Sequence, residues 1–327
     1  MAVSMPPDGA HVVLLGASGT IGRATCAELC AQGFAVTCLL RAPPPEGALP
    51  DGVHTVITRL DDAEAVAQSL APLAPPAAMI SCMASRSGRP RDAWAVEHAA
   101  HLVALEAAKR VGAGQFILLS AICVQKPLLE FQRAKLAFEA ALRQGRLPWT
   151  VIRPTAFFKS LSGQVARVQA GKPFLLFGDG TLTACKPISD SDLARYITGC
   201  IGAPDRMGRI LPVGGPGPAL TPRAQGEMLF DLLGQSPRFR QVPLALMDAV
   251  ISGLSAAGRV SARMAEKAEF ARIGRYYATE SMLVWDAERG RYDAEATPEF
   301  GLDTLRAHYA AMIRGARGAD LGEHAMF

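Results

Sequence analysis

The stretch VVLLGASGTIGRATCAEL, residues 12–29, decides the fold. An apolar run of strand length leads directly into Gly16, Gly19 and Gly22, which open a segment of helix length. Glycine permits a tight turn and lets backbone amides approach a pyrophosphate, which the free N–H groups at a helix N-terminus favour. In this strand, turn and helix context the pattern predicts a dinucleotide site. The residues expected to line it are Gly16, Ser18, Gly19, Thr20, Ile21 and Gly22.

Further apolar runs of strand length follow along the chain, separated by segments of helix length. The strands are expected at 35–40, 54–60, 78–83, 116–120 and 149–153, and the helices at 20–32, 92–111 and 128–144. Continuous rather than alternating apolar strands are typical of a parallel sheet that is covered on both faces. We therefore predict an α/β fold, a doubly wound parallel sheet of the Rossmann type.

The same pattern divides the chain into two parts. Residues 10–160 are expected to form the dinucleotide-binding domain, with 186–215 returning to its sheet. After Pro154 the alternation breaks. Residues 161–185 and 216–327 are expected to form a smaller, mostly helical region that binds substrate as a lid over the strand ends.

Composition excludes several classes of function. The 327 residues carry a net charge of +4 without basic runs, so no nucleic-acid partner is expected. The seven cysteines are scattered and form no paired CxxC clusters, so no metal site is expected. The first residues do not resemble a signal peptide, and the apolar segment at 242–254 is shorter than the ~20 residues that a membrane-spanning helix needs. We therefore expect a cytoplasmic protein.

The end of the second predicted strand bears on which dinucleotide binds. An acid there would bind the ribose 2′-hydroxyl of NAD, whereas a cation favours the 2′-phosphate of NADP. The strand ends in Arg41, and no acid occurs before Glu46. The sequence therefore predicts NADPH. Because ligands of open parallel sheets lie beyond the carboxyl ends of the strands, the other residues expected around the cofactor are Leu60, Asp61, Met83, Ala84, Ser85, Ser120, Ala121, Pro154 and Thr155.

The segment KPLLEFQRAKLAFE, residues 126–139, is similar to the catalytic helix of short-chain dehydrogenases, in which a tyrosine precedes a lysine by four residues. Here Phe131 stands four residues before Lys135, and no tyrosine occurs before Tyr196. Lys135 lies on an apolar stripe, where a cofactor ribose or phosphate is a reasonable partner for a buried cation. The lack of a phenol disfavours ketone reduction, whereas hydride addition to a conjugated carbon–carbon double bond stays open.

Four long, irregular strings at 118–139, 151–165, 171–194 and 274–284 resemble the divinyl chlorophyllide a 8-vinyl-reductases, and the resemblance extends from about 11 to 312. It implies an atypical short-chain dehydrogenase that uses NADPH to reduce the 8-vinyl group of a magnesium tetrapyrrole to ethyl in chlorophyll or bacteriochlorophyll synthesis. That family shows phenylalanine at the position of Phe131, so the missing tyrosine is a shared trait.

A flat, apolar substrate calls for apolar side chains, and a ring carboxylate calls for a cation. The apolar candidates are Phe131, Phe157, Phe158, Leu161 and the FLLF run at 174–177, and the cationic candidates are Lys126, Lys159, Lys186 and Arg275. Lys135 is expected to assist the reaction at the cofactor. The proton donor stays open between solvent, Lys126, Glu130, Cys123 and Tyr276.

Two other functions compete with this interpretation. The chain could be a non-enzymatic NADP-binding sensor or assembly factor, since fold does not fix function, or a reductase of another conjugated alkene. Peripheral contact of the helix around 243–256 with the photosynthetic membrane also stays open. The sequence does not indicate the oligomeric state.

Overall fold

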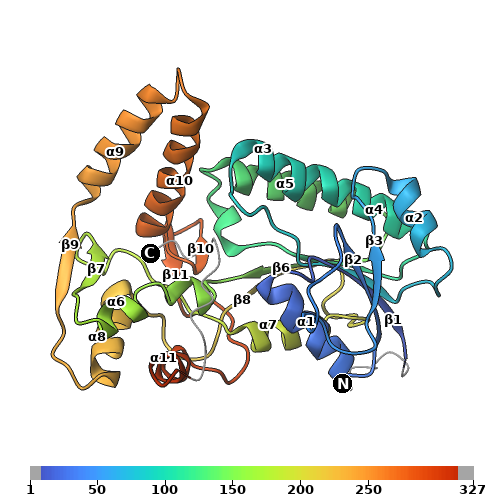
Figure 1. Cartoon of the computed structure of the whole chain (residues 1–327), viewed down its shortest axis with the longest axis horizontal. Helices are drawn as coiled ribbons and strands as arrows, with labels where there is room; N and C mark the ends of the chain where they lie inside the picture. The colour runs from blue at the N-terminus through green and yellow to red at the C-terminus, as the bar shows by residue number, and fades with distance from the viewer. Residues whose placement is uncertain (1–8, 316–327) are drawn as a thin grey trace.

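The computed structural model describes residues 9–315, and seven strands form one parallel sheet in the order β3-β2-β1-β4-β5-β6-β8 (Figure 1). The strand order reverses between β1 and β4, so the crevice that binds ligands in such sheets lies beyond these two strands. The predicted doubly wound fold is confirmed. The strands are β1 (His11–Leu15), β2 (Ala35–Leu40), β3 (His54–Ile57), β4 (Ala78–Ser81), β5 (Phe116–Leu119), β6 (Trp149–Pro154) and β8 (Arg209–Val213).

Helices cover both faces of the sheet because alternate residues of each strand point to opposite sides. Val12 and Leu14 of β1 pack in the core under α1 (Thr20–Ala31) and α7 (Asp190–Thr198). Val13 and Leu15 pack in a second core on the opposite face. That core lies under the helices α2 (Ala63–Leu70), α4 (His101–Arg110) and α5 (Glu130–Gln144).

Some expected elements differ at their ends. β3 ends at Ile57 and β4 at Ser81, each earlier than its apolar run. Beyond β4 the backbone turns to meet the glycine-rich turn, so Cys82 and Met83 lie outside the strand. The helix expected over 92–111 is composite, with α3 (Pro90–Ala93), a π-helix (Trp94–Ala100) and then α4.

The remaining segments pack beside the carboxyl ends of the strands. A third core joins Phe158, Leu176, Phe230 and Tyr309. It is built from α6 (Val165–Gln169), α8 (Pro222–Leu232), α11 (Leu305–Ile313) and the parallel pair β7 (Phe174–Phe177) and β9 (Phe239–Val242). A hairpin of β10 (Val284–Asp286) and β11 (Arg291–Asp293) lies at its border with the sheet.

Two helices, α9 (Leu244–Ala257) and α10 (Ala262–Thr279), form an arm that projects from the body of the molecule (Figure 1). No residue of α9 is buried. At its base α10 packs on the Rossmann part, where Ile273 and Tyr276 share a cluster with Ile122 and Phe131. Within residues 9–315 no helix combines the length and the apolar character needed to cross a membrane.

Candidate active site

The glycine-rich turn has the shape that a dinucleotide phosphate requires. Gly16 has φ +81°, and a Cβ there would lie 2.6 Å from the carbonyl carbon of Cys82. A Cβ on Gly22 would lie 2.1 Å from the carbonyl oxygen of Gly16. Gly19 caps α1 without a side-chain hydrogen bond. Because these glycines have no side chains, the turn can lie in close contact with both α1 and the residues after β4. The N-terminus of α1 is thereby open to a ligand.

Lys159 lies at this turn, in a short 3-10 helix that follows β6. Its Nζ donates to Oγ1 of Thr20, the first residue of α1, at 3.0 Å. The sequence pointed to Lys159 for a ring carboxylate of the substrate. The hydrogen bond places the ammonium at the N-terminus of α1, and the role of Lys159 toward a substrate stays a prediction.

Arg41 directly follows β2 and is exposed to solvent, at the position where a 2′-phosphate would bind. Within residues 9–315 no carboxylate forms an ion pair with Arg41, whereas Asp61 is paired with Arg59 at 2.6 Å. The guanidinium of Arg41 is therefore available to an anionic ligand.

Lys135 is buried beside the loop that follows β4. Its Nζ lies 2.7 Å from Oε2 of Glu97, a residue of the π-helix that the sequence did not single out. Oε1 of Glu97 accepts hydrogen bonds from the backbone N–H of Ser85 at 2.8 Å and from its hydroxyl at 3.2 Å. Of the other two residues expected in this loop, Met83 is half-buried and Ala84 is exposed.

Ser120, at the carboxyl end of β5, is held by a second buried carboxylate. Its hydroxyl donates to Oε1 of Glu139 at 2.6 Å, and Glu139 is also paired with Arg153. A serine has a single hydroxyl proton, so Ser120 does not offer a proton to a substrate in this arrangement. Ala121 is half-buried next to it, and Thr155 donates its own hydroxyl to the carbonyl of Lys186.

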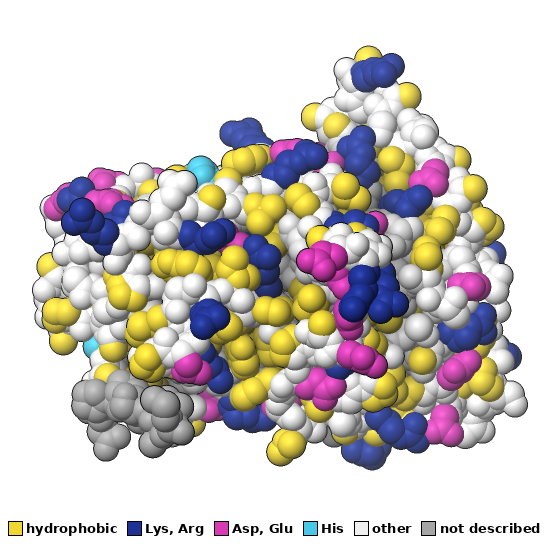
Figure 2. Space-filling view, turned by 180° about the vertical axis from the view of Figure 1, so that it is seen from behind, with side chains coloured by type: hydrophobic (Ala, Val, Ile, Leu, Met, Phe, Trp, Pro, Cys, Tyr) yellow, Lys and Arg dark blue, Asp and Glu magenta, His cyan; other side chains and the backbone are white. Residues whose placement is uncertain are grey.

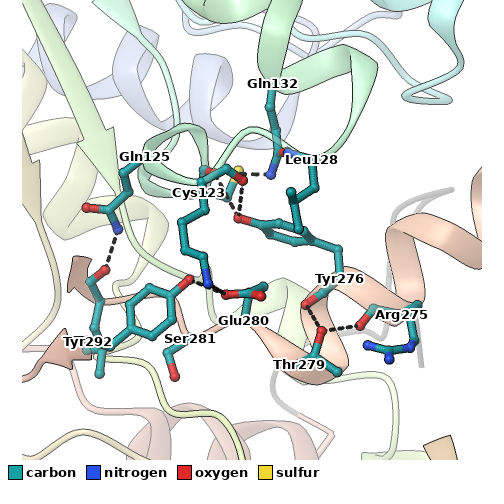
Figure 3. Close-up of polar contacts among 12 residues, drawn as sticks. Cys123, Gln125, Leu128, Gln132, Arg275, Tyr276, Thr279, Glu280, Ser281 and Tyr292 are labelled. Atoms are coloured by element: carbon teal, nitrogen blue, oxygen red, sulfur yellow. Dashed lines mark hydrogen bonds and ion pairs between the residues drawn. The ribbon is translucent and has the colours of Figure 1, made fainter. Parts of the chain in front are cut away.

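Tyr276 and Cys123, two candidate proton donors, are engaged with the protein (Figure 3). The Tyr276 hydroxyl donates to the Cys123 carbonyl at 2.8 Å, and burial raises the pKa of this phenol above its usual range. The thiol of Cys123 is buried as well, which raises its pKa. Neither group presents a readily released proton.

Lys126 and Glu130, the other two candidates, are also paired. Nζ of Lys126 lies 2.6 Å from Oε2 of Glu280 and 4.5 Å from the centre of the Trp285 ring. Glu130 accepts a hydrogen bond from Nε1 of Trp94 at 3.0 Å and pairs with Arg133, and these contacts lower the pKa of its carboxyl. Glu130 is therefore ionised near neutral pH and is a poor acid.

The apolar substrate candidates lie in different surroundings. Phe131 is buried against α10, and Phe158 is buried in the third core, whereas Phe157 and Leu161 are half-buried. In the FLLF run, Phe174 and Leu176 are buried and the two alternate residues are half-buried. Figure 2 shows apolar side chains gathered across the middle of one face, with Lys and Arg side chains around them.

Two further cationic candidates are, like Lys126, paired with carboxylates. Lys186 is buried and lies 2.6 Å from Glu299, and Arg275 lies 2.6 Å from Asp248 of α9. The first pair joins the segment before α7 to Glu299, and the second joins α9 to α10. Their roles toward a substrate stay predictions.

Comparisons with known proteins agree with this geometry. A family model described as NAD(P)H-binding matches residues 16–204. The divinyl chlorophyllide a 8-vinyl-reductase of Oryza sativa subsp. indica is 47% identical over 99% of this chain and 84% of its own length. The chain belongs to the divinyl chlorophyllide a 8-vinyl-reductase family. The Arabidopsis thaliana member of this family is 44% identical over 97% of the chain and 80% of its own length.

Solved structures show the fold that this reductase family shares with other nicotinamide-dependent proteins. The NADPH-dependent quinone oxidoreductase of Escherichia coli, solved with NADPH, superposes with a TM-score of 0.67 at 15% identity. The match covers 92% of this chain and 99% of that one. This likeness shows the Rossmann-type fold, and the NAD(P)H-binding family model begins at Gly16 of the glycine-rich turn.

Proposed function

We propose that this chain reduces the 8-vinyl group of divinyl chlorophyllide, or of a closely related magnesium tetrapyrrole, to an ethyl group with NADPH. The observation that carries the proposal is the similarity to the 8-vinyl-reductases along nearly the whole chain. The arrangement of the site supports it, because the glycine-rich turn and Lys135 both meet the loop after β4, the turn at Cys82 and the lysine through Glu97 and Ser85. The helix that carries this lysine has Phe131 in place of a tyrosine.

Bound NADPH supplies the hydride for this reaction. In the proposed site, Lys159 and the N-terminus of α1 hold the pyrophosphate, Arg41 the 2′-phosphate and Lys135 the nicotinamide ribose. The conjugated ring system of the pigment spreads the negative charge that hydride addition creates, so no phenolic acid is required at the reacting carbon. The chain contributes chiefly by positioning the two reactants.

We further propose that the proton comes from water. The hydroxyls of Ser120 and Tyr276 donate to protein acceptors, and Glu130 is ionised. The thiol of Cys123 is buried, and the Lys126 ammonium is paired with Glu280 and lies over the Trp285 ring. A proton from water explains how the reaction can proceed although each of these groups has another partner.

The direct test is to incubate the purified protein with NADPH and 8-vinyl chlorophyllide under anaerobic conditions. Loss of a conjugated vinyl group shifts the pigment absorption to shorter wavelength, and one NADPH should be oxidised for each pigment converted. Binding of NADPH without its oxidation would favour a sensor or assembly factor. Oxidation with another conjugated alkene but not with the pigment would favour a different reductase.

We also propose that the arm formed by α9 and α10 rests on an anionic membrane surface. α9 has no buried residue, and Leu246 is 56% and Val250 48% exposed. Val260, at the turn between the helices, is 91% exposed, and it lies between the exposed Arg259 and Arg263. Apolar side chains beside cations are typical of helices that lie in the interface of an anionic bilayer.

Flotation with lipid vesicles tests this contact. The protein should float with vesicles that contain phosphatidylglycerol and should bind less to phosphatidylcholine alone. The variant in which Leu246, Val250 and Val260 are changed to serine should lose flotation and keep its activity on detergent-solubilised pigment. If the chain does not float but sedimentation shows a dimer that the same variant abolishes, the arm binds a second copy and the membrane proposal fails.

A further inference from the structure

Glu97 is a deeply buried carboxylate near the cofactor turn, and it joins three elements. Its side chain is 2% exposed and that of Lys135 is 10% exposed. One carboxylate oxygen faces Lys135 of α5, and the other accepts both hydrogen bonds from Ser85 in the loop after β4. Glu97 itself belongs to the π-helix before α4. The carboxylate thus links the lysine-bearing helix to a loop at the edge of the ligand crevice.

A buried carboxylate is costly unless donors surround it. Burial alone would raise the pKa of Glu97. The charge of the Lys135 ammonium and the hydrogen bonds that the Glu97 carboxylate accepts outweigh burial and lower this pKa. His101 lies nearby with its pKa lowered to about 4 by burial, so it is neutral at physiological pH. Glu97 and Lys135 therefore form an isolated pair of opposite charges inside the protein.

The pairing leaves Lys135 with spare hydrogen-bonding capacity. A lysine ammonium has three N–H donors, and Glu97 accepts one of them at 2.7 Å. Within residues 9–315 Nζ donates to no other acceptor, so two donors remain for a ligand in the crevice. Because the carboxylate fixes where Nζ lies, it also fixes where those two donors point.

We infer that Glu97 is a positioning residue, which holds the Lys135 ammonium and the Ser85 loop in the arrangement that binds the nicotinamide ribose. This role rests on the proposed function, because it assumes a nicotinamide cofactor on Lys135. A π-helix at this point is consistent with the role, since such turns are frequent at functional sites.

The test compares two ligands with the variant Glu97→Gln, which keeps the shape of the side chain and removes its charge. Titration should show NADPH affinity lowered about tenfold, the loss expected for one charge-assisted hydrogen bond. Adenosine 2′,5′-bisphosphate, which lacks the nicotinamide ribose, should bind as it does to the wild type. Equal weakening of both ligands, or unchanged NADPH affinity, would overturn the inference.

A double variant shows whether Glu97 acts through Lys135. If it does, Glu97→Gln combined with Lys135→Met should bind NADPH no more weakly than Lys135→Met alone, because the interaction is already lost. If the loss of NADPH affinity in the double variant equals the product of the two single-variant losses, Glu97 has only a structural role. The matched control is Asp192→Asn, which alters another fully buried, ion-paired carboxylate in α7. This control should lower the melting temperature and leave NADPH affinity unchanged.

If Glu97→Gln does not fold, Glu97→Asp provides the same comparison, because it keeps the charge and is one methylene shorter. It should lose affinity for NADPH and not for the bisphosphate, and an unchanged affinity for NADPH would again contradict the inference. These measurements need no pigment. A wild-type protein that binds NADPH but fails to reduce divinyl chlorophyllide would refute the proposed function and leave the role of Glu97 to be decided by binding.

Discussion

Among single residues, three cations are proposed to share the contacts to one cofactor. Lys159 lies at the N-terminus of α1, Arg41 follows β2, and Lys135 lies on α5 beside Glu97. In the proposed site each cation binds a different part of the dinucleotide, so a substitution at each should change binding in its own way.

Arg41→Glu should weaken NADPH about 10–100-fold and NADH much less, because only NADPH has the 2′-phosphate. Fluorescence titration with both cofactors measures the ratio of the NADPH affinity to the NADH affinity. As a control, Arg143→Glu changes an equally exposed arginine near the end of α5 and should leave the ratio unchanged. An equal loss for the two cofactors with Arg41→Glu would refute its role at the 2′-phosphate.

Lys159→Met should weaken NADPH and NADH by the same factor, about tenfold, because both cofactors have the pyrophosphate that the lysine faces. The Michaelis constant for the pigment should change little. If instead cofactor affinity is unchanged and the pigment constant rises, Lys159 binds the ring carboxylate, as the sequence suggested.

Among the elements, the turn after β1 and the helix α1 can approach each other closely because Gly16 and Gly22 have no side chains. Gly22→Ala would place a methyl group 2.1 Å from the Gly16 carbonyl oxygen, which is part of the backbone and cannot rotate away. We expect a loss of stability of about 1–3 kcal/mol, the usual cost of overpacking, together with weaker cofactor binding.

Chemical denaturation measures the change in stability, and Gly253→Ala in α9 is the matched control. A Cβ at Gly253 meets no atom within 4 Å. Alanine there should stabilise the protein by roughly 0.5–1 kcal/mol, because it is the better helix former. A Gly22→Ala protein as stable as the wild type would show that α1 can move away from the turn without cost.

Elements with a simple period were predictable from the sequence, and those without one were not. The strands β1 and β2 match their apolar runs because a parallel sheet covered on both faces buries every residue of each run after the first. The π-helix was missed because its turn is longer than the period used to detect helices. Glu97 was missed for a different reason, since a lone acid in a helical segment is normally solvent-exposed.

At the scale of the whole molecule, residues far apart in the sequence decide which groups are available for chemistry. The sequence could list Tyr276 and Lys126 as acids, but not the Cys123 carbonyl or Glu280 that engage them. Likewise Lys159 lies 139 positions from Thr20 along the chain and meets it only because β6 and β1 end at the same edge of the sheet. Local patterns therefore predicted the cofactor turn, while the pairings required the folded chain.

In the proposed mechanism, hydride passes from NADPH to a carbon of the pigment without a phenolic acid. The most direct measurement uses NADPH labelled with deuterium at nicotinamide C4, prepared separately for each of its two faces, and mass spectrometry of the reduced pigment. We predict one deuterium in the new ethyl group with one of the two labelled cofactors, and an unchanged transfer in the variant Tyr276→Phe. A reduced pigment without deuterium from either cofactor, or no reduction by Tyr276→Phe, would contradict this mechanism.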